Sequence, residues 1–323
     1  MQQTTKGQSS GTRRRPPVPW HSRQLQQFRR CALLHQLCLL LLMAASIIAS
    51  TEALAIEDRA SSSAKTRWVP AIGQSWQIVL NAPLKIDPKK PVVIPDVDVY
   101  TIDLFDNSAQ TVAALHKLNK KVIAYFSAGT YEDWRSDAKK FAKDDLGKPM
   151  EDWAGERWLK LKSSNVRNIM AERIKLAAQK GFDAIDPDNV DGYGNKNGLG
   201  LTKADSVDFI KSLSKEAKKY GLSIGLKNAG EIIPQVLSVV DFQVNEQCVK
   251  YNEVQTFEAF IKAGKAVFHI EYPKGAPKSV STKTKAAIFG AKGTERFTTL
   301  LKTMDLDGWV EYRDGKHFIT KTG

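Results

Sequence analysis

Short runs of hydrophobic and β-branched residues alternate with amphipathic segments from residue 74 onward. The apolar runs occupy residues 74–80, 97–104, 121–128, 182–186, 223–228, 241–246, 266–272 and 298–304. Hydrophobic residues recur at helical spacing within residues 108–118, 166–180, 202–220 and 256–263. Strands that are buried on both faces need not alternate apolar with polar residues. Eight strands interleaved with helices over about 250 residues therefore predict the α/β class, as a single (β/α)8 TIM barrel.

The predicted helices carry signals for their ends. Thr202 or Ser206 is a candidate N-cap for the helix expected at residues 202–220. Gly181, Gly221 and Gly264 stand where the preceding helices should stop, because glycine readily adopts the left-handed conformation that ends a helix.

A doubly wound open sheet is the alternative architecture. Such a sheet often carries a glycine-rich dinucleotide fingerprint, but the glycine pairs at residues 192 and 194 and at 198 and 200 lack its spacing. No Gly-Lys-Ser/Thr loop follows a predicted strand, so a phosphate-binding loop is also missing. The barrel is the better prediction.

The N-terminal part of the chain has the pattern of a targeting segment. A thirteen-residue apolar run at residues 37–49 is shorter than the roughly 20 residues of a comfortable membrane span. It suits the core of a signal peptide, and the Ala-Leu-Ala at 53–55 suits a cleavage site. We therefore expect a signal peptide with a long basic n-region at residues 1–55, a Ser-rich linker at 56–67 and the barrel domain at 68–315. Cleavage predicts a secreted, extracellular protein; without cleavage the segment would be a type II signal anchor.

Composition agrees with a folded protein and narrows its partners. The 323 residues are 42% hydrophobic and 26% charged, with a net charge of +13. Seven basic residues and one acidic residue give +6 within residues 1–55, which leaves +7 for the rest. The lysine pairs are scattered and are not interleaved with aromatic residues, so we expect no nucleic-acid partner. Cys248 is the single cysteine after the leader, and we expect its thiol to be buried. We also expect the protein to be a monomer.

Acidic side chains gather at the ends of the predicted strands. They are Asp103 and Asp106, then Asp186, Asp188 and Asp191, then Glu246 and Glu271. Active sites of barrels lie at the C-terminal ends of the strands, so these carboxylates are expected to share one rim. Six aromatic residues lie at or just beyond the predicted strand ends, beside these carboxylates: Trp76, Tyr125, Tyr131, Trp134, Tyr193 and Tyr272. Paired carboxylates with aromatic platforms indicate glycoside hydrolysis.

Other chemistries lack their motifs. Residues 186–197 depart from a calcium-binding loop, with Asp191 at its sixth position where glycine is required. Neither a zinc-binding histidine pair nor a G-x-S-x-G elbow occurs. We expect no metal and no cofactor.

Several long motifs resemble glycoside hydrolase family 114. They are WVPAIGQSWQ (68–77), YFSAGTYEDWR (125–135), GERW (155–158), KGFDAIDPDNVDGY (180–193), GLKN (225–228), NEQC (245–248) and GKAVFHIEY (264–272). The resemblance implies a (β/α)8 barrel, a cofactor-free endo-α-1,4-galactosaminidase or α-galactosidase-like activity, and a galactosamine-containing polysaccharide as substrate. It implies Asp188 as nucleophile and Glu246 as acid/base, with Asp186 as the rival nucleophile. Family members commonly carry a second cysteine where this chain has Val254.

Ten further residues, at predicted strand ends or within these motifs, are expected to bind the substrate. They are Trp76, Asp103, Tyr125, Asp186, Asn189, Asp191, Lys227, Asn228, Glu271 and Tyr272. Lys227 is expected to hold a neighbouring carboxylate ionised. A retaining mechanism predicts that Asp188 and Glu246 lie roughly 5–5.5 Å apart, and the acid role predicts a raised pKa for Glu246. The alternative function is a secreted carbohydrate-binding barrel whose catalytic activity has been lost.

Overall fold

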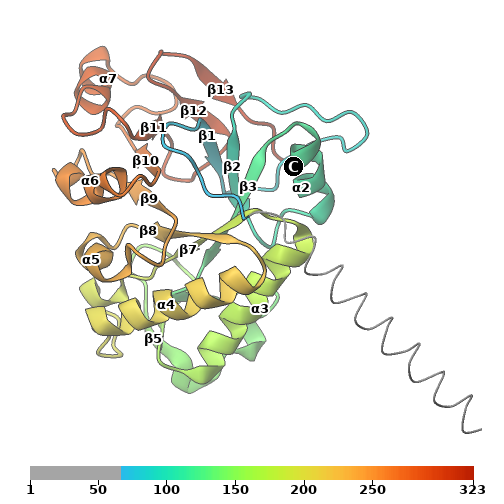
Figure 1. Cartoon of the computed structure of the whole chain (residues 1–323), viewed down its shortest axis with the longest axis vertical. Coiled ribbons are helices and arrows are strands. Elements are labelled where there is room, and N and C mark those ends of the chain that lie inside the picture. The colour runs from blue at the N-terminus through green and yellow to red at the C-terminus, as the bar shows by residue number, and fades with distance from the viewer. Residues whose placement is uncertain (1–66) are drawn as a thin grey trace, which may run out of the picture. The chain divides into compact units, whose positions relative to one another are not determined.

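The computed structural model describes residues 67–323, which Figure 1 colours from blue to red along the chain. The predicted leader and almost all of the predicted linker lie outside these residues. Within residues 67–323, no helix has both the length and the apolar character needed to cross a membrane.

Eight parallel strands form most of one curled, ten-stranded sheet. They are β1 (Trp76–Val79), β2 (Val99–Asp103), β3 (Lys121–Ser127), β7 (Ala184–Asp188), β8 (Ser223–Lys227), β9 (Phe242–Glu246), β10 (Val267–Glu271) and β11 (Thr298–Leu301). Each pairs in parallel with the next in this order. Every predicted strand is therefore confirmed, and the order is that of an α/β barrel.

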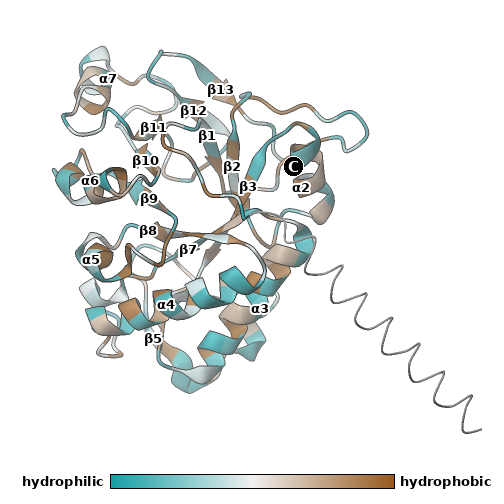
Figure 2. Cartoon of the chain, viewed as in Figure 1, coloured by the Kyte–Doolittle hydropathy of each residue, from teal (hydrophilic) through white to brown (hydrophobic). Residues whose placement is uncertain are grey.

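Helices cover the outside of this sheet. They are α2 (Ala109–Lys117), α3 (Ser164–Lys180), α4 (Lys203–Lys219), α5 (Ile233–Val236), α6 (Val254–Lys262) and α7 (Thr282–Phe289). Figure 2 shows mixed hydrophilic and hydrophobic segments on α3 and α4, as expected of helices that bury one face only. Thr202, not Ser206, caps α4, in a reciprocal pair with Asp205. Gly181 ends α3 with φ of 89°.

Two parts of the fold were not predicted. Strands β4 (Thr130–Glu132), β5 (Leu146–Pro149) and β6 (Glu156–Leu159) form a separate antiparallel sheet between β3 and α3. Strands β12 (Trp309–Glu311) and β13 (His317–Ile319) extend the main sheet in antiparallel fashion after β11. Short 3₁₀ turns complete the fold, which are η1 (Ala138–Lys140), η2 (Lys143–Asp145), η3 (Gly192–Gly194) and η4 (Gly230–Ile232).

Side chains join the two ends of the parallel series. Within residues 67–323 no strand ladder links β1 to β11. Instead, the indole of Trp76 donates a hydrogen bond to the carbonyl of Thr298 at 2.9 Å, and Tyr312 donates to the carbonyl of Trp76 at 3.0 Å. Trp76 also packs against Phe268, with ring centroids 4.8 Å apart. Side-chain contacts of Trp76 thus connect β1 with β11 and with the residue that follows β12.

Candidate active site

Two carboxylates meet at the C-terminal ends of β7 and β9. Asp188 is the last residue of β7 and Glu246 is the last of β9, with β8 between these strands. The last residue of β8 is Lys227, whose Nζ lies 3.2 Å from Asp188 Oδ2 and 3.3 Å from Glu246 Oε2. The sum of these two lengths sets an upper limit of about 6.5 Å on the distance between the two oxygens. The structure therefore brings the predicted pair together around one ammonium.

Asp188 is held by donors from two directions. The hydroxyl of Tyr125 donates to its Oδ2 at 2.9 Å, and the backbone N–H of Asn189 donates to its Oδ1 at 2.7 Å. Asn189 has φ of 59°, and its side chain donates to Ser127 Oγ at 2.9 Å. This turn fixes the direction of the Asp188 carboxylate at the strand end.

Glu246 is held as a carboxylate. Asn228 donates its amide to Oε2 at 2.9 Å and accepts from the backbone N–H of Glu246 at 2.9 Å, while the hydroxyl of Tyr272 donates to Oε1. Burial raises the pKa of Glu246, but Lys227, Tyr272 and Asn228 outweigh burial and lower it below its usual value. The expectation of a raised pKa for Glu246 in the free protein is therefore wrong.

Lys227 keeps its charge at the base of this arrangement. Only 2% of the residue is exposed, and burial by itself would lower its pKa. The charges of Asp188, Glu246 and Asp186 together raise the pKa instead. Lys227 therefore lies in contact with both neighbouring carboxylates, where the sequence had placed it.

A cleft of about 530 Å³ opens above the pair. Nine of the twelve predicted site residues line it, which are Asp103, Tyr125, Asp188, Asn189, Asp191, Lys227, Asn228, Glu246 and Tyr272. Burial and the nearby Asp188 raise the pKa of Asp191 to about 6. Most of the residues predicted at the C-terminal ends of the strands thus line one cleft.

Three predicted substrate-binding residues do not line the cleft. Trp76 is 0% exposed in the sheet interior, where an early position on β1 places its ring in the hydrophobic core. Glu271 is buried and accepts from the backbone N–H of Val249 at 2.9 Å. Asp186 is fully buried, and neither of its oxygens has a hydrogen-bond partner within the described residues. Burial raises the pKa of Asp186 to about 7.

The small sheet of β4, β6 and β5, together with the residues that follow β4, supplies side chains to which the sequence had assigned no role. Arg135 donates to Asp103 Oδ2 at 2.7 Å and lies 2.8 Å from Glu132 Oε1, and both carboxylates face the cleft. Glu156 also lines the cleft, and burial raises its pKa to about 7. These residues stand in the motifs at 125–135 and 155–158, but no strand-end position marked them, because β4 and β6 lie outside the main sheet.

The same sheet brings exposed tryptophans to the rim of the cleft. Trp134 is 55% exposed and Trp153 is 49% exposed, and both line it. A second hollow of about 400 Å³ shares Glu246, Asp191 and Asn228 with the cleft. It is also lined by Tyr193 and Tyr251. Glu246 thus lines two hollows that both carry aromatic side chains.

The chain is similar to known proteins in both sequence and structure. The profile of glycoside-hydrolase family GH114 matches residues 57–318. No curated protein sequence matches the chain. Among solved structures, the complex of Aspergillus fumigatus Ega3 with galactosamine is 48% identical with a TM-score of 0.73, and the alignment covers 77% of this chain and 98% of Ega3.

A second solved structure is more distant. The glycoside hydrolase domain of PelA from Pseudomonas aeruginosa is 14% identical, with a TM-score of 0.55. The alignment covers 72% of this chain and 95% of that domain. This likeness concerns the fold alone.

Proposed function

The chain belongs to glycoside-hydrolase family GH114 and is a glycosidase, and on this premise we propose that it cleaves internal α-galactosaminidic links of a galactosamine-containing polysaccharide with retention. The proposal rests on one observation: the carboxylates of Asp188 and Glu246 both contact the ammonium group of Lys227. The distance between Asp188 Oδ2 and Glu246 Oε2 is at most about 6.5 Å. This limit is compatible with the separation of roughly 5–5.5 Å between the carboxyl groups of retaining glycosidases, and it leaves little room for the water that inversion requires.

Asp188 is the proposed nucleophile and Glu246 the proposed acid/base. Asp188 faces the cleft, whereas its rival Asp186 is fully buried and cannot reach a sugar carbon without a rearrangement of the strand end. Attack of an Asp188 oxygen on the anomeric carbon forms the glycosyl ester, while Glu246 protonates the departing oxygen. In the second step Glu246 takes a proton from water, which attacks the same carbon and releases Asp188.

The carboxylate form of Glu246 is the form that the second step requires. For the first step Glu246 needs a proton, which the low pKa of the free protein opposes. We infer that a bound sugar excludes water from the cleft and strengthens the repulsion between Glu246 and Asp188, so that the proton affinity of Glu246 rises.

The electrostatics of the cleft favour a cationic sugar. Eight acidic residues line it against two basic ones, Lys227 and Arg135. The acidic residues are Asp103, Asp106, Glu132, Glu156, Asp188, Asp191, Glu246 and Asp305. Deacetylated galactosamine carries an ammonium group, so a negative cleft attracts it even though the chain as a whole is basic. Galactosamine is also the ligand in the Ega3 complex.

Internal cleavage needs room for the chain on both sides of the scissile link. The main cleft and the second hollow share Asp191, Asn228 and Glu246, so both adjoin the proposed acid/base. We propose that sugars on one side of the link occupy the cleft near Trp134 and Trp153. Sugars on the other side would occupy the hollow near Tyr193 and Tyr251.

The full architecture that we propose is a closed (β/α)8 barrel. Trp76, Thr298 and Tyr312 supply the side-chain contacts between β1 and the last strands, in place of a backbone ladder. Secretion is proposed from the apolar run at residues 37–49 and the Ala-Leu-Ala that follows it, with a signal anchor as the other outcome.

The decisive experiment measures new reducing ends. The chain is incubated with an α-1,4-linked galactosamine polymer and with its fully acetylated form, beside an Asp188→Asn control. We expect reducing ends from the deacetylated polymer in the wild type alone, with short oligosaccharides from the start of the reaction. Binding of the polymer without any release of reducing ends would support a carbohydrate-binding protein and overturn the proposal.

A further inference from the structure

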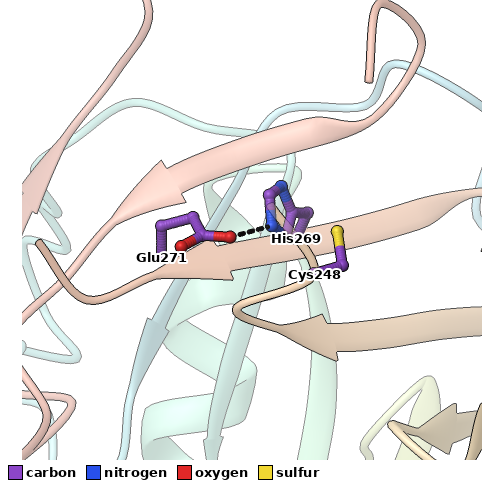
Figure 3. A group of neighbouring side chains, drawn as sticks. All are labelled: Cys248, His269 and Glu271. Atoms are coloured by element: carbon purple, nitrogen blue, oxygen red, sulfur yellow. Dashed lines mark hydrogen bonds and ion pairs between the residues drawn. The ribbon is translucent and has the colours of Figure 1, made fainter. Parts of the chain in front are cut away.

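A thiol, an imidazole and a carboxylate meet on the outer side of the sheet, away from the cleft. They belong to Cys248, which follows β9, and to His269 and Glu271 on β10 (Figure 3). One sulfur, one nitrogen and one oxygen of these residues lie within 4.8 Å of one another, and all three residues are buried.

Strand periodicity brings two of these side chains to one face. Phe268 and Ile270 belong to the hydrophobic cluster inside the sheet, so His269 and Glu271 point to the opposite face. His269 Nε2 lies 3.0 Å from Glu271 Oε1, and Figure 3 shows the Cys248 thiol beside the imidazole. The cluster is thus built by a strand and by the loop of its neighbour.

The donor set is that of a borderline-soft divalent cation. Zn²⁺ binds thiolate, imidazole and carboxylate ligands, whereas Mg²⁺ and Ca²⁺ favour oxygen ligands. Tetrahedral Zn²⁺ holds its ligand atoms about 3.5 Å apart, which modest side-chain movement achieves from separations of at most 4.8 Å. One thiolate and one carboxylate balance the charge of the cation, so burial leaves no net charge.

Neighbouring groups orient two of the three ligands, His269 and Glu271. His269 Nδ1 lies 3.0 Å from Thr299 Oγ1, which directs the other ring nitrogen toward Cys248 and Glu271. Glu271 Oε1 accepts the backbone N–H of Val249 at 2.9 Å. Histidine ligands of metals almost always carry such a partner on the far nitrogen, and ligating carboxylates are themselves hydrogen-bonded.

We propose that Cys248, His269 and Glu271 bind Zn²⁺ and so tie the loop after β9 to strand β10. The cation takes the place of the hydrogen bond between His269 and Glu271, and the thiol releases its proton on binding. Three protein ligands leave the fourth position of the cation to a water molecule. The proposal is independent of the reaction in the cleft.

The test uses Co²⁺ as a spectroscopic probe for Zn²⁺. The full chain carries Cys31 and Cys38 as well, so the reference protein is the full chain with both changed to serine, which leaves Cys248 as its only thiol. After removal of metal by a chelator, we expect one equivalent of Co²⁺ to produce a thiolate-to-cobalt charge-transfer band that Zn²⁺ abolishes. The variant Cys248→Ala in the same background should show no band.

Two further variants keep the outcome decisive. Thr299→Val retains all three ligands and should weaken Co²⁺ binding about 10- to 100-fold. Glu246→Gln, in the cleft, should leave binding unchanged. Zn²⁺ should also raise the melting temperature of the reference protein and not that of Cys248→Ala. Absence of the band from a correctly folded reference protein, or equal binding by Cys248→Ala, would overturn the proposal.

Discussion

The Nζ of Lys227 lies 3.3 Å from Oε2 of Glu246, and both atoms belong to residues that end neighbouring parallel strands. The same ammonium lies 3.2 Å from Asp188 Oδ2, so one buried cation serves two carboxylates. This contact keeps Glu246 ionised in the free protein and holds the pair close enough for a shared reaction.

The first prediction concerns the carboxylate pair. Asp188→Asn removes the proposed nucleophile and Glu246→Gln removes the proposed proton donor, so each should lower kcat at least about 100-fold. Neither side chain is part of the hydrophobic core, so circular dichroism should be unchanged. Release of reducing ends from the deacetylated polymer measures the effect. Near wild-type turnover by either folded variant would contradict the assignment, and exposed Asp152→Asn serves as the control.

The second prediction concerns stereochemistry. Double displacement through an Asp188 ester inverts the anomeric carbon twice, so the product formed first should be the α anomer. Proton NMR of the early reaction distinguishes the two anomers before mutarotation mixes them. Initial release of the β anomer would establish single displacement and would mean that Asp188 activates water instead.

The third prediction concerns Lys227. Lys227→Met removes the charge that stabilises both carboxylates, so the pKa of Glu246 should rise. The alkaline limb of the pH–rate profile, on which Glu246 loses the proton that the first step needs, should therefore move to higher pH. Breaking a buried ion pair should also lower the free energy of unfolding by about 3 kcal/mol. A matched change of an exposed lysine, Lys196→Met, should alter neither quantity. An unmoved pH profile in the Lys227 variant would contradict this role.

The fourth prediction concerns pH-dependent stability at Asp186. Burial raises its pKa to about 7, so the folded protein holds a proton that the unfolded chain loses near pH 4. Stability should therefore fall as the pH rises from about 4 to about 7, by at most about 1.4 kcal/mol per pH unit from this group. In urea unfolding, Asp186→Asn should flatten that slope. An equal slope in the wild type and the variant would show that Asp186 does not retain the proton.

The fifth prediction separates rim tryptophans from a core tryptophan. Trp134→Ala and Trp153→Ala should each raise KM for the polymer several-fold, because stacking contributes about 1 kcal/mol, with little change in unfolding. Trp76→Ala should instead lower the free energy of unfolding by about 3–5 kcal/mol. Urea denaturation and initial-rate kinetics on all three variants test the contrast. A raised KM for folded Trp76→Ala alone would reverse the correction made for that residue.

Local patterns in the sequence were sufficient for the parallel framework. Apolar runs identified β1, β2, β3, β7, β8, β9, β10 and β11, because burial on both faces demands hydrophobic residues whatever the neighbours are. Thr202 and Gly181 marked helix ends for a similarly local reason, since caps satisfy backbone groups within a few residues. Because the active sites of barrels lie at the C-terminal ends of the strands, the positions of Asp188, Lys227 and Glu246 after predicted strands placed them on one rim.

Tertiary structure alone decided what each of these side chains does. The aromatic side chain of Trp76 could stack on a sugar, but its position in β1 buries it. The exposed tryptophans that line the cleft, Trp134 and Trp153, lie instead in the segments between the strands of the β4–β6–β5 sheet. The pKa of Glu246 depends on Lys227, Asn228 and Tyr272, which are distant in sequence and converge only when the sheet curls. The cluster of Cys248, His269 and Glu271 likewise exists only because β9 and β10 are paired. Charge–charge and metal–ligand interactions act over a few ångströms in space, so the sequence determined which groups were available and the fold determined their partners.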